Sequence, residues 1–201
     1  MLRVLIATEN LGKLKEFQDI LQNKVACLTP LDPSLEKKAS IHVVEDGQTY
    51  FENALKKALG YHQAFRVPVL ADDSGLEVEP LGNGPGVFTA RFGGVGLSWP
   101  ERWRFLHGAL APFSQETWRA RFRCVLCYYD GVNVPIFFEG TAQGMILPEA
   151  RGQAGFGYDP VFFSSALRKS FAEASPKEKN QISHRAVAVR SFLDWASHQT
   201  A

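Results

Sequence analysis

The start of the chain shows two successive patterns of hydrophobic and polar positions. Residues 2 to 7 form a continuous apolar run, which predicts a buried strand, and Leu14, Phe17 and Leu21 then recur at helical spacing. The polar segment Thr8 to Lys13 separates the two elements. Because backbone N–H groups are exposed where a helix begins, this segment is a candidate anion site. A strand-to-helix turn capped by Asn10, without any ligand, fits the pattern equally well.

A second helix and an acidic segment follow. Thr49 and Glu52 have capping-box spacing, which predicts a helix that continues to about Leu59. After Pro68, three apolar residues predict a short strand that ends at Asp72-Asp73-Ser74-Gly75. Adjacent carboxylates at the end of a buried strand cost free energy unless a cation compensates them, so the pattern favours a magnesium site. A solvated turn is the alternative, since Asp, Ser and Gly are all turn formers.

The second half of the chain repeats both kinds of pattern. Ser98 and Glu101 predict another capped helix, and residues 118 to 129 alternate as a half-buried strand does. Asp130-Gly131 predicts a hairpin with a return strand over 132 to 138. We expect a glycine-rich loop over 140 to 157, a short strand, a polar linker and a C-terminal helix capped by Ser183. The elements together predict an α/β fold with a mixed sheet.

The length, net charge and cysteine count limit the classes of function that the chain could have. The chain has 201 residues and a formal net charge of +1, which suits one compact domain over residues 1–201 and gives no overall field for nucleic acid or membrane. We therefore expect a small phosphorylated ligand, no nucleic acid and no membrane partner. No signal peptide or membrane span is expected. Three cysteines make an odd count, which favours the cytoplasm, and the alternation over Cys124 to Cys127 argues against a redox or zinc motif.

Two further segments carry candidate chemistry. Residues 155 to 160 present Phe156 and Tyr158 on a glycine-containing loop beside Asp159, which suits stacking on a base and accepting its N–H groups. Phe156 fits a place in the core as well. The residues His184 and Arg185 offer donors at a helix start, although such a pair is often solvated surface.

Taken together, the motifs resemble the inosine triphosphate pyrophosphatase family, also called non-canonical purine NTP pyrophosphatases. The resemblance covers nearly the whole chain, and the matching segments occur in the family's order. They are Ala7 to Asn10 with Lys13 and Glu16, Phe51 to Ala54 with Lys57 and Ala58, Ala71 to Leu76, Pro85-Gly86 with Ala90-Arg91, Gly155 to Pro160, and Ser183-His184-Arg185.

The resemblance implies a fold, an activity and a set of residues. It implies an elongated mixed sheet flanked by helices, two lobes with a substrate cleft between them, and a homodimer that hydrolyses ITP, dITP and XTP to the monophosphate and pyrophosphate. Asp73 would be the proton acceptor, and Glu45 and Asp73 would lie near Mg²⁺. The substrate would contact Thr8, Glu9, Asn10, Leu11, Gly12, Lys13, Ser74, Phe156, Gly157, Tyr158, Asp159, Lys179, His184 and Arg185.

The sequence also departs from the family and leaves two rivals open. Glu9 stands where many relatives carry a small residue, and its carboxylate would repel a triphosphate unless it points away or helps hold metal. A pyrophosphatase for pyrimidine or modified nucleotides would share the metal and phosphate residues. A non-catalytic RNA-binding module would instead use the aromatic loop and the arginines at 119, 121 and 123.

Overall fold

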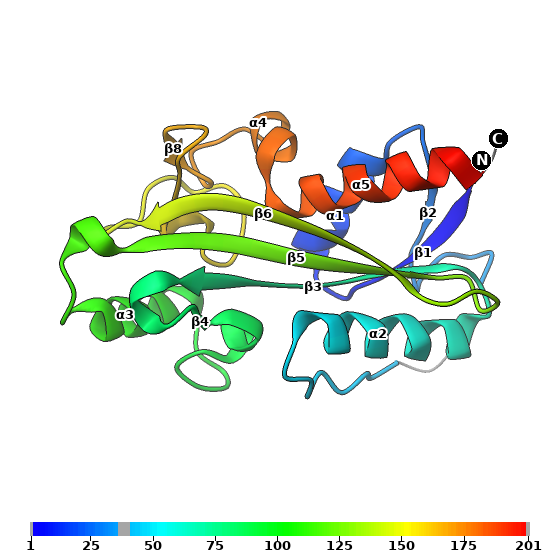
Figure 1. The fold of residues 1–201 in the computed structure, drawn as a ribbon, viewed down its shortest axis with the longest axis horizontal. Helices are drawn as coiled ribbons and strands as arrows, with labels where there is room; N and C mark the ends of the chain where they lie inside the picture. Colours follow the sequence, from blue (N-terminus) through cyan, green and yellow to red (C-terminus); the bar gives the residue numbers. More distant parts are fainter. Residues whose placement is uncertain (1, 36–40, 200–201) are drawn as a thin grey trace. The chain divides into compact units, whose positions relative to one another are not determined.

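The computed structural model describes residues 2–35 and 41–199 (Figure 1). The chain divides into two compact units. Unit 1 consists of Met1–Asp73, Cys124–Gly140 and Arg185–Ala201, and unit 2 consists of Ser74–Arg123 and Thr141–His184. The interpretation of residues 1–201 as one domain stays a prediction. No helix within the described ranges is long and apolar enough to cross a membrane.

The described residues form both helices and strands, as the patterns predict. The helices are α1 (Leu11–Leu21), α2 (Tyr50–Phe65), α3 (Trp99–Leu110), α4 (Pro176–Ile182) and α5 (His184–Gln199). The strands are β1 (Arg3–Ala7), β2 (Ala26–Leu28), β3 (Val69–Val78), β4 (Gly84–Pro85), β5 (Arg119–Tyr129), β6 (Ile136–Ile146), β7 (Phe162–Ser164) and β8 (Lys169–Ser170). Their order in the sheet is β2-β1-β3-β5-β6-β7-β8, and β4 pairs with β3.

The sheet is mixed, which confirms the predicted fold class. Strand β1 runs parallel to β2 and β3, whereas β4 is antiparallel to β3 and β7 is antiparallel to both β6 and β8. Because parallel neighbours require a crossover, β1 and β2 are connected through α1, and β3 follows α2. The cleft and the elongation implied by the resemblance stay predictions.

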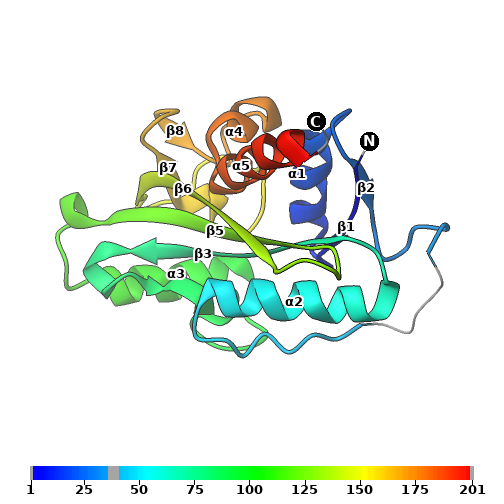
Figure 2. The same ribbon diagram turned by 45° about the vertical axis from the view of Figure 1, so that its right-hand side comes forward.

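In unit 1, helices cover both faces of the sheet (Figures 1 and 2). Alternate residues of β1 and β3, such as Ile6 and Leu70, pack against Phe17 of α1 and against Val189 and Phe192 of α5. Helix α2 lies on the opposite face and buries Ala54, Ala58 and Tyr61, among others. Residues one position apart on β3 therefore point into different surroundings.

Three predicted helix starts, at Asn10, Thr49 and Ser98, are confirmed by their capping contacts. Helix α5 begins at His184, directly after Ser183, and the cap by Ser183 stays a prediction. The Asn10 side chain accepts a hydrogen bond from Lys13 N at 3.0 Å, and Thr49 and Glu52 form the capping box of α2. In unit 2, the Glu101 carboxylate accepts a hydrogen bond from Ser98 N at 2.8 Å at the start of α3. Each cap satisfies backbone donors that the first helical turn leaves without a partner in the helix.

The core of unit 2 is built around aromatic side chains. Phe122 of β5 stacks on Phe171 with ring planes 5° apart and lies 4.6 Å from Phe162, centroid to centroid. Leu106 and Leu110 of α3 are fully buried in the same cluster.

The prediction that the strand ends at the acidic tetrapeptide was wrong. Strand β3 runs from Val69 to Val78, so Asp72, Asp73 and Ser74 lie inside it. Asp72 is 1% exposed and Asp73 is 7% exposed. The solvated-turn alternative is therefore excluded as well. The strand continues because side chains from other elements compensate both carboxylates.

Three other predicted element boundaries, in the second half of the chain, differ from those in the structure. The return strand starts at Ile136 rather than Val132, because the Asp130 carboxylate accepts hydrogen bonds from Val132 N and Asn133 N and holds a longer loop. Residues 140–146 belong to β6, not to the glycine-rich loop. The expected polar linker contains the short strand β8 and helix α4.

Candidate functional site

The loop between β1 and α1 is ordered by its own side chains. Thr8 Oγ1 accepts a hydrogen bond from Asn10 N at 3.2 Å, and Asn10 in turn caps α1. Glu9, Asn10 and Leu11 are exposed, and Leu11 retains 80% of its accessible surface. Gly12 and Lys13 are half-buried. An exposed polar segment at the positive end of a helix is an environment that favours anions.

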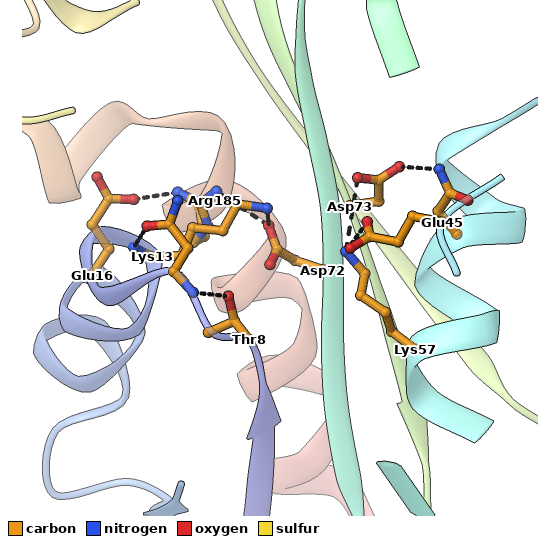
Figure 3. A network of polar contacts seen from close by, with 10 residues as sticks. Thr8, Lys13, Glu16, Glu45, Lys57, Asp72, Asp73 and Arg185 are labelled. Atoms are coloured by element: carbon orange, nitrogen blue, oxygen red, sulfur yellow. Dashed lines mark hydrogen bonds and ion pairs between the residues drawn. The ribbon is translucent and has the colours of Figure 1, made fainter. Parts of the chain in front are cut away.

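The register of the sheet brings this loop to the acidic pair. Ala7 of β1 is paired with Ala71 of the parallel strand β3. The next residues along the two strands are Thr8 and Asp72, so the loop begins at the level of the carboxylates. Asp72 and Asp73 then leave β3 on opposite faces, Asp72 toward α1 and α5 and Asp73 toward α2 (Figure 3).

Asp72 belongs to a buried charged network. Its Oδ2 lies 2.9 Å from Lys13 Nζ and accepts a hydrogen bond from Arg185 Nη2 at 3.1 Å. Arg185 also donates through Nη1 to Glu16 of α1. Burial alone would raise the pKa of Asp72, but the ammonium of Lys13 and the guanidinium of Arg185 outweigh it and hold this pKa well below its ordinary value. Asp72 therefore stays ionised and anchors Lys13.

Asp73 has different surroundings. Its Oδ2 accepts a hydrogen bond from Asn53 Nδ2 at 3.0 Å, and its Oδ1 lies 3.8 Å from Lys57 Nζ. Burial raises the pKa of Asp73 above its ordinary value, although Lys57 and Lys13 act against that rise. A carboxylate whose proton affinity is raised is a better proton acceptor than an ordinary aspartate.

Glu45 approaches the same lysine from the segment before α2. Its Oε2 lies 2.7 Å from Lys57 Nζ, and its side chain is 42% exposed. Glu45 and Asp73 thus converge on one ammonium group. Such an oxygen donor set fits Mg²⁺, which proteins commonly hold by one or two carboxylates while substrate phosphates and waters complete the shell. Within residues 2–35 and 41–199, no cluster of three His, Cys, Asp or Glu side chains is arranged to hold a metal.

A second group of predicted residues lies together in unit 2. Asp159 Oδ2 accepts a hydrogen bond from Phe156 N at 2.9 Å and lies 2.5 Å from Lys179 Nζ. The same ammonium lies 5.0 Å from the centroid of the Phe156 ring, within cation–π range. Gly157 O accepts a hydrogen bond from Trp103 Nε1 at 3.0 Å. An aromatic face, an ammonium group and a carboxylate therefore lie together at the half-buried ring of Phe156.

The remaining predicted residues have mixed surroundings. Tyr158 is 1% exposed, and its ring packs edge-on against Trp99. His184 is 5% exposed and stacks on Phe122 with centroids 4.8 Å apart. Ser74 is half-buried on β3. Arg185 is 1% exposed, so its guanidinium serves the network with Glu16 and Asp72. Substrate contact by these four residues stays a prediction.

Two of the three arginines that suggested an RNA-binding surface, Arg121 and Arg123, lie beside a carboxylate. Arg121 Nε donates to Glu77 Oε2 at 2.5 Å, and Arg123 Nη1 lies 3.8 Å from Glu77 Oε1. Cys124 and Cys127 are fully buried, and burial raises their thiol pKa values, that of Cys127 to about 12. The two thiols are therefore not reactive groups.

The contacts of Asn53, Lys57 and Glu16 with the acidic pair and Arg185 were not predicted from the sequence. These residues contributed to the family resemblance but received no function of their own. Asn53 and Lys57 are four residues apart, and both are buried on the face of α2 that points to the sheet. Polar side chains at that spacing on an otherwise apolar helix face were the available signal.

The fold and these groups define a class of protein: an α/β protein with a mixed sheet, a polar strand-to-helix loop and two oppositely directed buried carboxylates on the adjacent strand. Comparison with known proteins identifies the family. The model of the Ham1 family matches residues 4–195. This chain belongs to the Ham1 family, which confirms the predicted relationship.

Several relatives have similar sequences and structures. The chain is 38% identical to a dITP/XTP pyrophosphatase of Vibrio parahaemolyticus over the full length of both proteins. It is 39% identical to a dITP/XTP pyrophosphatase of Desulfotalea psychrophila, with 92% of this chain and 81% of that protein covered. The solved structure of a HAM1 protein from Coxiella burnetii matches with a TM-score of 0.84 at 33% identity, covering 98% and 100% of the two chains.

Proposed function

We propose that this chain hydrolyses the abnormal purine nucleotides dITP, XTP and ITP to the nucleoside monophosphate and pyrophosphate. The relatives named dITP/XTP pyrophosphatase support this activity, since the similarity extends over nearly the whole chain. The observation that carries the proposal is the position of Asp73. This buried carboxylate lies beside Asn53 and Lys57, on the strand next to the anion loop.

The triphosphate is assigned to the β1–α1 loop. The segment Thr8 to Lys13 supplies hydroxyl, amide and ammonium donors at the start of α1, where the helix dipole favours negative charge. Lys13 is held by Asp72 at 2.9 Å, which limits its conformational freedom before substrate binds. Its ammonium group is placed to stabilise the charge that develops on the pyrophosphate leaving group.

Asp73 is assigned the role of general base. It orients a water molecule and accepts its proton while the water oxygen forms a bond to the α-phosphorus and the bond to pyrophosphate breaks. The raised pKa of Asp73 suits this step, and the hydrogen bond from Asn53 fixes the orientation of the carboxylate. Glu45 and Asp73 would hold Mg²⁺, which would neutralise part of the phosphate charge when bound.

The base is assigned to the aromatic group of unit 2. The Phe156 ring offers a stacking surface, and Asp159 and Lys179 provide an acceptor and a donor beside it. A 6-oxo group accepts hydrogen bonds, whereas the 6-amino group of adenine donates them. A site with buried donors rejects a mismatched group by about four orders of magnitude, because those donors lose their partners.

The test is pyrophosphate release from ITP, dITP, XTP, ATP, GTP, dTTP and UTP, each with and without Mg²⁺. We expect magnesium-dependent release from ITP, dITP and XTP and little from the others. Activity confined to dTTP and UTP would instead support the pyrimidine rival, and absence of release from every nucleotide would contradict the proposal.

The homodimer and the cytoplasmic location complete the proposal. The homodimer rests on the family resemblance, and the location rests on the odd number of cysteines. Sedimentation equilibrium of the purified chain measures the first, and a mass of one chain at micromolar concentration would contradict it. Fractionation of cells that produce the full chain measures the second.

A further inference from the structure

The position of the Lys57 ammonium group matters for metal binding. Its Nζ lies 2.7 Å from Glu45 Oε2 and 3.8 Å from Asp73 Oδ1 (Figure 3). These are the two carboxylates to which the proposed function assigns Mg²⁺. The ammonium group of Lys57 therefore forms an ion pair with one proposed metal ligand, Glu45, and lies close to the other, Asp73.

This lysine is a permanent charge of unit 1. Only 7% of Lys57 is exposed, and a buried ammonium is costly unless carboxylates compensate it. The carboxylates of Glu45 and Asp73, 2.7 Å and 3.8 Å from its Nζ, provide this compensation. In turn, the ammonium group of Lys57 stabilises two carboxylates that would otherwise repel each other.

The neighbouring residue Lys56 provides a natural contrast. It also forms an ion pair, with Asp46 at 2.5 Å, but the two side chains are 44% and 68% exposed. Solvent screens this pair, and its contribution to local electrostatics is small. Two consecutive lysines of α2 thus differ in burial while they carry the same charge on the same helix.

We propose that Lys57 acts as an internal counter-cation that competes with the divalent metal for Glu45 and Asp73, so that the metal binds well only together with a triphosphate. This inference rests on the magnesium site of the proposed function. A divalent ion near these carboxylates must displace the ammonium or approach another positive charge. The phosphate oxygens of a nucleotide supply the additional ligands and negative charge that tip this competition toward the metal.

The experiment measures metal binding without nucleotide and without turnover. Mn²⁺ is the probe, and free Mn²⁺ is followed by its electron paramagnetic resonance signal during titration of the full chain. Lys57→Met removes the charge but keeps a chain of similar length. Lys56→Met is the matched control, and Lys57→Met combined with Glu45→Gln tests whether the gained affinity comes from the assigned carboxylates.

We expect Lys57→Met to bind Mn²⁺ on the order of 10- to 100-fold more tightly than the wild type, since one unit charge a few ångströms away is removed. The Lys56→Met variant should match the wild type, and the double variant should lose the gain. Equal or weaker Mn²⁺ binding by Lys57→Met would overturn the proposal. If the wild type hydrolyses dITP with Mg²⁺ while this result is obtained, the proposed function stands and only the role of Lys57 fails.

A second measurement covers the case in which Lys57→Met does not fold. The side-chain NMR signals of Lys57 in the wild type, assigned with Lys57→Arg, are followed while Mg²⁺ is added without nucleotide. We expect the signals to shift as the ammonium leaves Glu45, while those of Lys56 stay constant. Saturation with Mg²⁺ without any shift at Lys57 would overturn the competition.

Discussion

Asp72 and Asp73 are neighbours in the chain, yet they occupy two regions with different electrostatics. On one face of β3, Asp72 is bonded to Lys13 and Arg185, and its pKa is strongly lowered. On the other face, Asp73 is bonded to Asn53, is farther from Lys57, and has a raised pKa. Two close cations make a carboxylate a permanent anchor, whereas burial with weaker compensation prepares a carboxylate to accept a proton.

The largest difference should be seen in catalysis. Asp73→Asn is expected to lower kcat by roughly two to four orders of magnitude, because the amide cannot accept a proton from water. Nucleotide affinity should change much less, since the substitution keeps the shape of the side chain. Initial rates of pyrophosphate release and nucleotide titration measure the two effects, with the exposed Asp46→Asn as control. A kcat equal to that of the wild type would remove Asp73 from the mechanism.

The second expected effect is a loss of stability, and it concerns Asp72 on the other face of β3. Asp72→Asn should lower the free energy of unfolding by about 3–5 kcal/mol, because it leaves the half-buried charge of Lys13 and the buried charge of Arg185 without their shared carboxylate. Urea unfolding measures this change. Asp73→Asn should cost clearly less, and equal costs for the two variants would mean that the faces do not differ as described.

The pH dependence of stability should have opposite signs at the two residues. In the folded chain, the pKa of Asp72 is below the ordinary value of 3.8. Its contribution to the free energy of unfolding is therefore present above pH 3.8 and is lost as the pH falls below that value. Asp73 has a folded pKa above 3.8, so its contribution is complete below pH 3.8 and is lost as the pH rises through the folded pKa.

Urea unfolding of Asp72→Asn and Asp73→Asn from about pH 3 to about pH 7 tests these signs. A tenfold difference in proton affinity between the folded and the unfolded chain corresponds to about 1.4 kcal/mol of stability, which urea unfolding resolves. The Asp72 variant should lose less stability on acidification than the wild type. The Asp73 variant should lose less as the pH rises from about 4. If the stability difference from the wild type changed in the same direction with pH in both variants, the comparison of the two residues would be contradicted.

The smallest effect concerns the two helix caps. Asn10→Ala at α1 and Thr49→Ala at α2 should each lower the free energy of unfolding by about 1 kcal/mol, because each removes an acceptor for a backbone N–H. Only Asn10→Ala should also raise KM for the nucleotide, since Asn10 lies in the proposed phosphate loop. Thermal unfolding and initial rates measure both. A similar rise of KM in Thr49→Ala would show that the effect is not local to that loop.

Much of the architecture was predictable because local signals agree with the fold. The caps at Asn10, Thr49 and Ser98 and the alternation in β5 fix their elements through interactions between residues close in the chain. The end of β3 was not predictable in this way. Asp72 and Asp73 continue the strand only because their partners come from residues 13, 53, 57 and 185, far away in sequence.

The sequence by itself determined the family, the α/β class and the identity of the candidate residues, since ordered motifs and local capping chemistry are properties of the chain. The tertiary structure alone decided the surroundings and the proton affinity of each carboxylate. The two-residue period of a strand sends Asp72 and Asp73 to opposite faces, and the helices packed on those faces supply different cations at different distances. Proton affinity depends on those distances and on burial, which neighbouring letters in a sequence do not encode.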